Sequence, residues 1–327
     1  MRLTRRTMLA GLASTALAPR LRAADFRPLP QPDPALWHID DAPTITGQAA
    51  GPNGGIYYRL YGQAGRTPII TLHGGPAAGE MSMRPYVGLA ADRQVVTYDQ
   101  SGCGKSARPA DMSLYTVDRY VEELEALRRH LAFDRVILIG HSWGGFLGPA
   151  YAARYPGQVA GLVLAGTAVR VADFEEAARR WLADFGPDAQ AIVARAAPDD
   201  PAYGKLLANY YARHLCRLDP YPDWFVRLGE EIGRNPVYAY LNGPSEFQFT
   251  GALAGLDSSR ALKSIRCPTL ITCGEYDEAP PWVAQKIRKL VRRSKVAVFP
   301  QLSHMAHVED PALVIGTTGA FLNAAKL

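Results

Sequence analysis

The sequence predicts an α/β fold with a mostly parallel central sheet, helices on both faces and an inserted helical lid domain. Short apolar runs typical of buried strands alternate with amphipathic helical stretches over residues 44–167, and this alternation resumes over residues 256–327. Repeated strand–helix order requires right-handed crossovers, which make a parallel sheet that is covered on both faces. Residues 168–255 show a helical pattern instead. This stretch is too long for a loop, so we expect it to form the lid.

The first part of the core is expected to contain most of the strands. Thr116 is predicted to cap a helix that runs through Leu131, with acidic residues early and basic residues late, as the helix dipole prefers. The apolar run that ends before Gly140 is typical of a buried parallel strand. The expected strands of this part are Thr44–Ala49, Ile56–Tyr61, Pro68–Leu72, Gln94–Tyr98, Arg135–Ile139 and Val159–Leu164.

The lid and the second part of the core follow the same reasoning. In the lid, Phe174, Trp181 and Phe185 fall on a helical repeat that Gly186-Pro187 closes. The segment is rich in other aromatic residues as well. The second part of the core is expected to contain a strand at Pro268–Cys273, a helix at Pro281–Val291, a strand at Lys295–Phe299 and a last helix from Pro311.

The first 24 residues have the features of an export signal. Arg5 and Arg6 precede an apolar run from Met8 to Ala18, and Ala23 and Ala24 provide small residues for cleavage. The run is shorter than the roughly 20 residues that a membrane-spanning helix needs. The paired arginines resemble a twin-arginine signal, so we expect a bacterial periplasmic or secreted protein with no stable membrane association after cleavage. The alternative is an amphipathic or disordered tail.

Residues 25–43 are predicted to be a Pro-rich leader. Proline occupies every second position from Pro28 to Pro34, which favours an extended chain. We therefore expect this segment to be extended and to contribute no element to the core.

The charge of the chain lies mainly in the export signal. The 327 residues include 36 Lys and Arg against 31 Asp and Glu, a formal charge of +5 that would suggest a nucleic-acid or membrane partner. Removing the five arginines of the first 24 residues from the 36 leaves 31 basic residues against 31 acidic ones. No nucleic-acid partner is therefore expected. With 48% hydrophobic and 20% charged residues, the composition is globular and excludes collagen-like and coiled-coil structure.

The four cysteines do not form a disulfide framework. Cys267 and Cys273 share one predicted strand, where six residues separate them by about 20 Å, too far for a disulfide. The sequence leaves open whether Cys103 or Cys216 is paired. Because the chain contains no CxxC motif, zinc is not expected, and we predict free, mostly buried thiols.

The strongest motif is GHSWGG at residues 140–145, between a predicted strand and a predicted helix. It fits G-x-S-x-G, the nucleophile elbow, in which small residues permit a sharp turn. The turn raises the Ser142 hydroxyl above the sheet edge and points the helix N-terminus at it. Ser142 is therefore predicted to be a nucleophile rather than a structural turn serine.

A serine nucleophile needs a base, and the base needs an acid that orients it. In α/β-hydrolase order, the acid and then the histidine follow the nucleophile at the ends of later strands. Asp277 and His304 each follow such a strand and are predicted to fill these two roles. His307 is the rival base, although it is expected to pack against or bond the loop. Glu275 and Glu278 are the rival acids.

The HGGP motif at residues 73–76 is predicted to supply the oxyanion hole. A glycine-rich turn after an early strand can point a backbone N–H at a developing negative charge. The expected donors are the N–H groups of Gly75 and Trp143. His73 and His141 flank glycine turns, and we expect them to brace loops.

Together these motifs resemble those of the proline iminopeptidases, serine peptidases of the α/β-hydrolase fold. The resemblance covers nearly the whole chain after the export signal. One departure is Ala77, where the family usually has glycine in HGGPG, and this bears on the substrate pocket more than on the mechanism. The motifs that carry the resemblance are HGGP, YDQSGCGKS, GHSWGG, NGPSEF, GEYDE and SHMAHVEDP.

The resemblance implies a site for the α-ammonium group of the substrate. Glu246 from the lid and Glu278 beside the acid would bind this group, and Gly74 would also belong to the substrate-binding site. Two carboxylates near a desolvated ammonium favour its charged form, as recognition of a free N-terminus requires. The alternatives are a solvated lid residue for Glu246 and a loop charge for Glu278. Some lid aromatics would then wall a small pocket for a proline-like ring.

The sequence thus predicts a serine hydrolase that cleaves an amide bond next to a free amino group, without a metal or organic cofactor. Its substrate would be a small peptide that loses its N-terminal residue, preferentially proline. An alternative substrate is an amino-acid amide or ester such as L-proline amide. An esterase without amine recognition and a catalytically silent binding protein of the same fold are the other classes, and the silent protein would typically lack a triad residue. The oligomeric state is left open.

Overall fold

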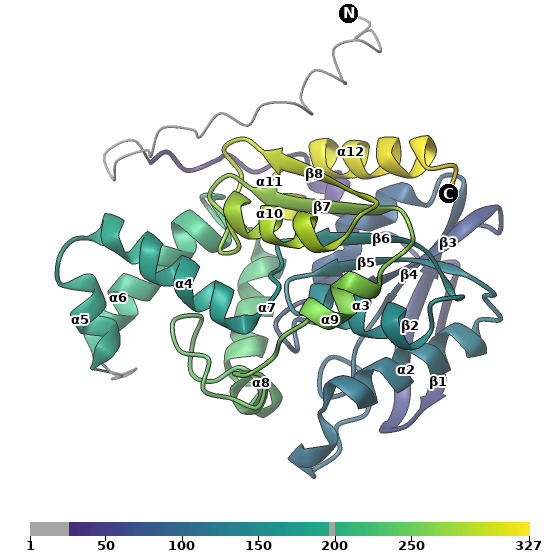
Figure 1. The fold of residues 1–327 in the computed structure, drawn as a ribbon, viewed down its shortest axis with the longest axis horizontal. Helices are drawn as coiled ribbons and strands as arrows, with labels where there is room; N and C mark the ends of the chain where they lie inside the picture. The colour runs from purple at the N-terminus through teal and green to yellow at the C-terminus, as the bar shows by residue number, and fades with distance from the viewer. Residues whose placement is uncertain (1–25, 196–199) are drawn as a thin grey trace, which may run out of the picture.

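The computed structural model describes residues 26–195 and 200–327, so the predicted export signal lies outside the described residues. Its centre is an eight-stranded sheet with the order β1-β2-β4-β3-β5-β6-β7-β8 (Figure 1). β2 is antiparallel to β1 and β4, and the remaining neighbours are parallel, which confirms the predicted fold class. The strands are Ile45–Gly51, Gly54–Tyr61, Arg66–Leu72, Arg93–Tyr98, Val136–His141, Val159–Ala165, Thr269–Gly274 and Ser294–Phe299 (β1 to β8).

Successive strand residues point to opposite sides of the sheet, and apolar residues on both sides pack against helices. In β3, Ile70 and Leu72 belong to the hydrophobic core under one helical layer, whereas Ile69 belongs to the core under the other. The first layer contains α2 (Val117–His130), α3 (Gly144–Arg154), α9 (Ser259–Ser264) and α10 (Pro281–Leu290), and the second contains η4 (Glu80–Leu89), α11 (Ala306–Glu309) and α12 (Pro311–Ala324).

The ends of these helices agree with the sequence signals. The Thr116 side chain caps α2 by accepting a hydrogen bond from the Arg119 N–H, as predicted. A short 3₁₀ turn, η5 (Met112–Leu114), comes just before this cap. Among the helices formed by the described residues, none is long and apolar enough to cross a membrane.

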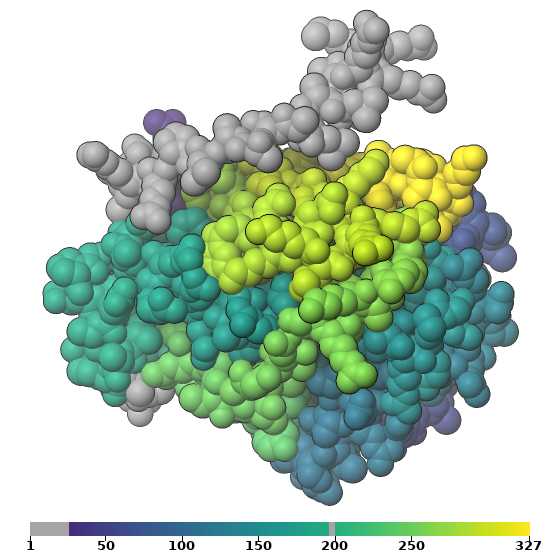
Figure 2. All heavy atoms as spheres, in the orientation of Figure 1, coloured from purple at the N-terminus to yellow at the C-terminus, as the bar shows by residue number. Residues whose placement is uncertain are grey.

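Between β6 and α9 the chain forms the helices that we call the lid, at one end of the sheet (Figure 1). In the space-filling view the lid, which runs from teal to green, lies against the yellow-green residues of the second part of the core (Figure 2). Its helices are α4 (Val171–Leu182), η6 (Ala183–Phe185), α5 (Ala189–Ala194), α6 (Pro201–Tyr210), η7 (Tyr211–Leu215), α7 (Asp223–Gly233) and α8 (Pro236–Leu241). The helices from α4 to η7 pack around a small hydrophobic core of their own that includes Leu182, Tyr210 and Phe247. Trp224 of α7 packs with Trp37 instead, and Leu241 of α8 belongs to the core of the sheet.

The Pro-rich segment packs against the body of the protein, so the expectation that it contributes nothing to the core is wrong. Leu29 forms a parallel bridge with Leu218 of the lid. The segment then forms a 3₁₀ helix, η3 (Pro34–Trp37), whose Trp37 is 3% exposed and donates a hydrogen bond to the Val308 carbonyl at 2.8 Å. The prolines keep the chain extended, and Leu29 between two of them keeps an N–H, which donates to the Arg217 carbonyl at 2.7 Å.

All four cysteines are free, which confirms that prediction. Cys103, Cys216 and Cys273 are buried, and Cys267 is half-buried. Cys267 lies two residues before β7 rather than on the strand that the sequence predicts for it.

Candidate active site

Ser142 lies on a sharp turn between β5 and α3. Its φ of 53° is in the left-handed region, and its backbone N–H donates to the Ala165 carbonyl on β6 at 2.9 Å. The neighbouring glycines are required because side chains would collide with backbone: a Cβ at Gly144 would meet the Leu72 carbonyl, and one at Gly140 would meet the Gly144 carbonyl. The turn leaves Ser142 half-buried, with the N-terminus of α3 directly after it.

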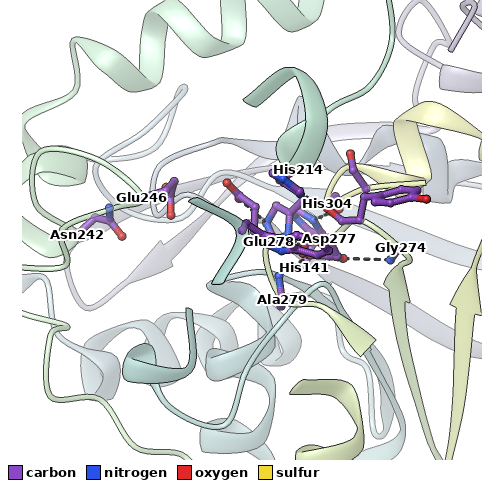
Figure 3. A network of polar contacts seen from close by, with 12 residues as sticks. His141, His214, Asn242, Glu246, Gly274, Asp277, Glu278, Ala279 and His304 are labelled. Atoms are coloured by element: carbon purple, nitrogen blue, oxygen red, sulfur yellow. Dashed lines mark hydrogen bonds and ion pairs between the residues drawn. The ribbon is translucent and has the colours of Figure 1, made fainter. Parts of the chain in front are cut away.

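His304 lies in the loop after β8 and is held from three sides (Figure 3). Its Nδ1 donates to Asp277 Oδ1 at 2.7 Å. The His304 backbone N–H donates to the His214 carbonyl, and the His304 carbonyl accepts from His141 Nε2, each at 3.0 Å. Since His141 directly precedes Ser142, this last bond ties the histidine loop to the turn that carries Ser142.

Asp277 is completely buried and both of its oxygens have partners. The Gly274 N–H donates to Oδ2 at 3.1 Å, and the Ala279 N–H donates to Oδ1 at 2.8 Å, besides the bond from His304. Such bonds stabilise a buried carboxylate in its charged form. The rival acid Glu275 instead accepts a hydrogen bond from the Gln301 N–H.

The rival base His307 lies elsewhere. Its Nε2 donates to the Ser82 carbonyl at 3.0 Å, and its ring stacks on Tyr86 with centroids 5.4 Å apart. The structure therefore pairs His304, not His307, with the buried Asp277.

The HGGP loop lies against the serine turn. A Cβ at Gly74 would be 3.0 Å from the Cβ of Ser142, so this loop approaches the serine more closely than a side chain allows. Gly75 has a φ of 105°, and Trp143 occupies the N-cap position of α3. Within residues 26–195 and 200–327, neither the Gly75 nor the Trp143 backbone N–H has a hydrogen-bond acceptor.

Gln100 joins the side chain of Trp143 to the HGGP loop, a role that the sequence analysis missed. Its side-chain oxygen accepts from Trp143 Nε1 at 2.8 Å, and its Nε2 donates to the His73 carbonyl at 3.1 Å. The Gln100 N–H in turn donates to His73 Nε2 at 3.0 Å, so His73 braces the loop as expected. The signal that could have identified Gln100 is its place in YDQSGCGKS, two residues after the end of β4.

Core and lid together line a cavity at the serine. The core contributes Gly75, Ser142 and Trp143, and the lid side contributes Glu246 together with apolar side chains. The remaining lining residues are Pro76, Phe146, Val171, Phe174, Asn242, Phe249 and Leu253.

Glu246 is held by other lid side chains. The Tyr238 hydroxyl donates to Glu246 Oε1 at 2.5 Å and accepts from Asn242 Nδ2 at 3.1 Å. Burial raises the pKa of Glu246, although the bond from Tyr238 and the charge of His304 act in the opposite direction.

Glu278 is almost fully buried, with 4% exposure, and its carboxylate has no good partner. Oε1 makes no hydrogen bond in the described part of the chain, and Oε2 lies 3.8 Å from His304 Nε2. Burial raises the pKa of Glu278, the charge of His304 lowers it, and Glu246 and Asp277 raise it further. The structure thus places Glu278 Oε2 opposite His304 Nε2, whereas Glu246 lies farther away and acts on His304 through its charge (Figure 3).

Two lid residues, Trp181 and His214, brace the loops that carry Asp277 and His304. Trp181 Nε1 donates to the Asp277 carbonyl at 3.0 Å. The ring of Trp181 stacks on His214 with centroids 4.4 Å apart, and His214 Nδ1 donates to the Tyr276 carbonyl at 2.8 Å. These contacts join residues far apart in the sequence, so no local sequence pattern predicts them.

Arg217 makes a second brace, between the Pro-rich segment and the histidine loop. Its guanidinium donates to the Gln301 carbonyl and, at 2.8 Å, to the Arg27 carbonyl. Its backbone N–H donates at 2.6 Å to Glu309, which also accepts from the Ser303 N–H at 2.6 Å. The residue before His304 is therefore fixed through Arg217 and Glu309.

The arrangement places a serine, a histidine and a buried carboxylate at the carboxyl ends of parallel strands, as serine hydrolysis requires. No hydrogen bond joins Ser142 Oγ to His304 Nε2 among the residues that the structure describes. No group of three or more His, Cys, Asp or Glu side chains within these residues is arranged to hold a metal ion.

Comparisons with known proteins agree with this geometry. The model of the α/β hydrolase fold family matches residues 67–311. A proline iminopeptidase of Heyndrickxia coagulans is 35% identical over 264 residues, which are 80% of this chain and 92% of that protein. A proline iminopeptidase of Saccharolobus solfataricus is 37% identical over 78% of this chain and 84% of its own. The crystal structure of the Mycobacterium smegmatis proline iminopeptidase superposes with a TM-score of 0.81 at 28% identity, over 86% of this chain and 98% of that one.

Proposed function

Because the chain belongs to the proline iminopeptidase family of α/β hydrolases, we propose that it is a serine aminopeptidase that releases the N-terminal residue of small peptides, preferentially proline. The observation that carries the proposal is the cavity lined by Ser142 and Glu246. Phe174 of its lining meets the His304 ring edge-on, and His304 in turn pairs with Asp277 and faces the buried Glu278. A silent binding protein of this fold would have no use for this combination.

In the proposed reaction, Ser142 Oγ attacks the carbonyl carbon of the first peptide bond while His304 Nε2 accepts its proton. Asp277 accepts from His304 Nδ1, which fixes the imidazole tautomer and stabilises the imidazolium. The N–H groups of Gly75 and Trp143 stabilise the oxyanion, and His304 returns the proton to the leaving amine. Water then hydrolyses the acyl-enzyme by the same route in reverse.

Specificity for a free amino end resides in Glu246 and Glu278. A substrate ammonium between these carboxylates would satisfy charges that the free protein leaves poorly paired. The apolar rings of Phe174 and Phe249 border the same cavity and suit the pyrrolidine ring of proline, while Gly74 lets the backbone approach the scissile carbonyl. A hydrolase of small amino-acid amides would use the same residues. An esterase without amine recognition would not need two buried carboxylates.

A substrate panel combined with Glu246→Gln tests the proposal. We expect hydrolysis of prolyl-naphthylamide, prolinamide and prolyl esters, and little hydrolysis of their N-acetylated forms. Glu246→Gln should lower kcat/KM on the free-amine substrates about tenfold to a hundredfold, since a hydrogen bond to a charged group contributes ~1.5–3 kcal/mol. Glu230→Gln, the same charge change at an exposed lid position, is the matched control. Unchanged rates for Glu246→Gln would contradict amine recognition, and the naphthylamide and amide rates decide between peptide and small-amide substrates.

We also propose that the protein is exported to the periplasm or secreted. The support is the sequence of the first 24 residues, with the paired Arg5 and Arg6 before an apolar run. Changing both arginines to lysine should leave the enzyme in the cytoplasm at its unprocessed length. Cell fractionation and N-terminal sequencing measure this, and continued export of the variant would contradict a twin-arginine signal.

A further inference from the structure

The contact between Glu278 and His304 involves the nitrogen that catalysis needs. Nδ1 of His304 is occupied by Asp277, so only Nε2 can accept the proton of Ser142. Yet Nε2 faces Glu278 Oε2 at 3.8 Å, in surroundings where both residues are at most 5% exposed. The second oxygen of Glu278 has no partner in the described ranges. A buried carboxylate with one unpaired oxygen and one imidazole neighbour is a site prepared for a cation.

The other groups around His304 favour its charged form. Burial lowers the pKa of His304, but Asp277, Glu278 and Glu246 outweigh burial and raise the pKa to about 9. The neighbouring His141 and His307 rings do not oppose this by carrying charge, because burial lowers the pKa of each of them. With Glu278 ionised beside it, His304 holds a proton on Nε2, and an imidazolium cannot act as a base for Ser142.

We propose that Glu278 holds the Nε2 edge of His304 in the free enzyme, and that a substrate ammonium releases the imidazole by taking its place between Glu278 and Glu246. This proposal rests on the proposed function, and it gives Glu278 a second role beyond binding the amine. The enzyme would then select free-amine substrates in the chemical step as well as in binding.

The exchange is balanced in charge. The ammonium brings one positive charge into the buried cluster, and His304 loses the proton on Nε2 to solvent water, so the net charge of the cluster is unchanged. His304 is then neutral, with Nδ1–H donated to Asp277 and a free lone pair on Nε2 for the Ser142 hydroxyl proton. An acetylated or amine-free substrate cannot make this exchange, because it brings no cation.

Glu278→Gln tests the proposal with two substrates of the same shape. The first is the 4-nitrophenyl ester of proline, and the second is the 4-nitrophenyl ester of cyclopentanecarboxylic acid, in which a CH₂ replaces the ring NH₂⁺. The glutamine keeps the volume of Glu278 but removes the charge that opposes release of the proton. Glu275→Gln, the same change three residues earlier in the loop, is the matched control because its side chain contacts the Gln301 N–H instead.

We expect opposite effects on the two substrates. Glu278→Gln should lower kcat/KM on the prolyl ester about tenfold or more, because one amine contact is lost. It should raise kcat on the cyclopentane ester at pH 7 about tenfold, because removing one neighbouring anion lowers the pKa of His304 by about one unit. The pH profile of the cyclopentane ester should rise at lower pH in the variant than in the wild type, since an anion beside the imidazole raises its pKa.

A second measurement uses the unaltered protein. Methylammonium should accelerate enzymatic hydrolysis of 4-nitrophenyl acetate, a substrate small enough to leave the amine site free, once the rate without enzyme is subtracted. Glu278→Gln should remove this activation.

Each contrary outcome has a defined meaning. If Glu278→Gln lowers the prolyl rate but neither raises the cyclopentane rate nor shifts its pH profile, and methylammonium does not activate the wild type, the release of His304 is overturned while the amine site stands. If the prolyl rate is unchanged in both Glu278→Gln and Glu246→Gln, the proposed function loses its amine recognition, and this inference fails with it.

Discussion

At the edge of the sheet the reactive side chains are held by backbone groups, whereas in the lid they are held by other side chains. Ser142 is fixed by its turn and by the Ala165 carbonyl, and Asp277 is fixed by the N–H groups of Gly274 and Ala279. Glu246 depends instead on the Tyr238 hydroxyl, which depends on Asn242. A backbone bond survives most substitutions, and a side-chain network does not.

This difference separates two tasks. The sheet edge positions groups that every serine hydrolase needs, and strand ends can hold them with little freedom. In the proposed function the lid supplies the groups that recognise the substrate, and side chains whose hydrogen bonds stay within the lid can change without disturbing the sheet. Two lid residues nevertheless form hydrogen bonds with the loops at the sheet edge. Trp181 donates to the Asp277 carbonyl, and Arg217 donates to the Gln301 carbonyl in the histidine loop.

The largest effect should come from the sheet edge. Ser142→Ala should lower kcat about 10⁴- to 10⁶-fold, because removing the nucleophile removes the whole covalent route. Melting temperature should stay close to that of the wild type, since the hydroxyl is not needed for the turn. Ser113→Ala, at an exposed position, should leave the activity unchanged. Burst kinetics with a prolyl ester would measure the acyl-enzyme, and near-full turnover by Ser142→Ala would show that another residue attacks.

The same division explains what could be predicted from the sequence. Strands β3 to β8 appear in the sequence as short apolar runs. The elbow requires glycines, because backbone atoms lie where their side chains would be. Both features can therefore be recognised from a few neighbouring residues. The contact of Trp181 with Asp277 spans 96 residues, and that of Arg217 with Arg27 spans 190. Such contacts arise only once the fold is complete.

Proline spacing likewise predicted an extended chain, which the leader has where Leu29 forms its bridge, but it predicted neither the helix η3 nor the docking of the leader. An alternating series of prolines predicts an extended chain, but it does not predict which surface the chain packs against. The surface is provided by the lid backbone at Leu218 and by the apolar neighbours of Trp37. Leu218 follows Leu29 by 189 residues, and Val308 follows Trp37 by 271 residues.

A smaller effect should appear where lid and sheet edge meet. Trp181→Phe keeps the ring that stacks on His214 but removes the N–H that donates to the Asp277 carbonyl. We expect kcat to fall about threefold to tenfold with little change in KM, since a lost neutral hydrogen bond costs about 1 kcal/mol and Asp277 does not touch the substrate. Trp282→Phe on α10 is the control. If KM rises and kcat stays constant, Trp181 serves the substrate pocket rather than the acid.

The smallest effect concerns one strained residue in the loop after β3. Ala77 has a φ of 76°, a left-handed conformation that glycine adopts at no steric cost, which accounts for the glycine expected at this position. Ala77→Gly should raise the free energy of unfolding by about 0.5 kcal/mol, because relief of strain of ~1–2 kcal/mol exceeds the added entropy of the unfolded chain, ~0.4–1 kcal/mol. Chemical denaturation measures this.

Ala78→Gly provides the comparison that isolates backbone strain at the sheet edge. Ala78 is buried to nearly the same degree but has no positive φ, so glycine there should lower the free energy of unfolding by about 0.5–1 kcal/mol through the unfolded state alone. If the two substitutions change the free energy of unfolding in opposite directions, the difference comes from the backbone conformation of the two alanines. Equal losses at both positions would mean that the Cβ of Ala77 packs well enough to offset its strain, and that backbone geometry alone does not govern the sheet edge.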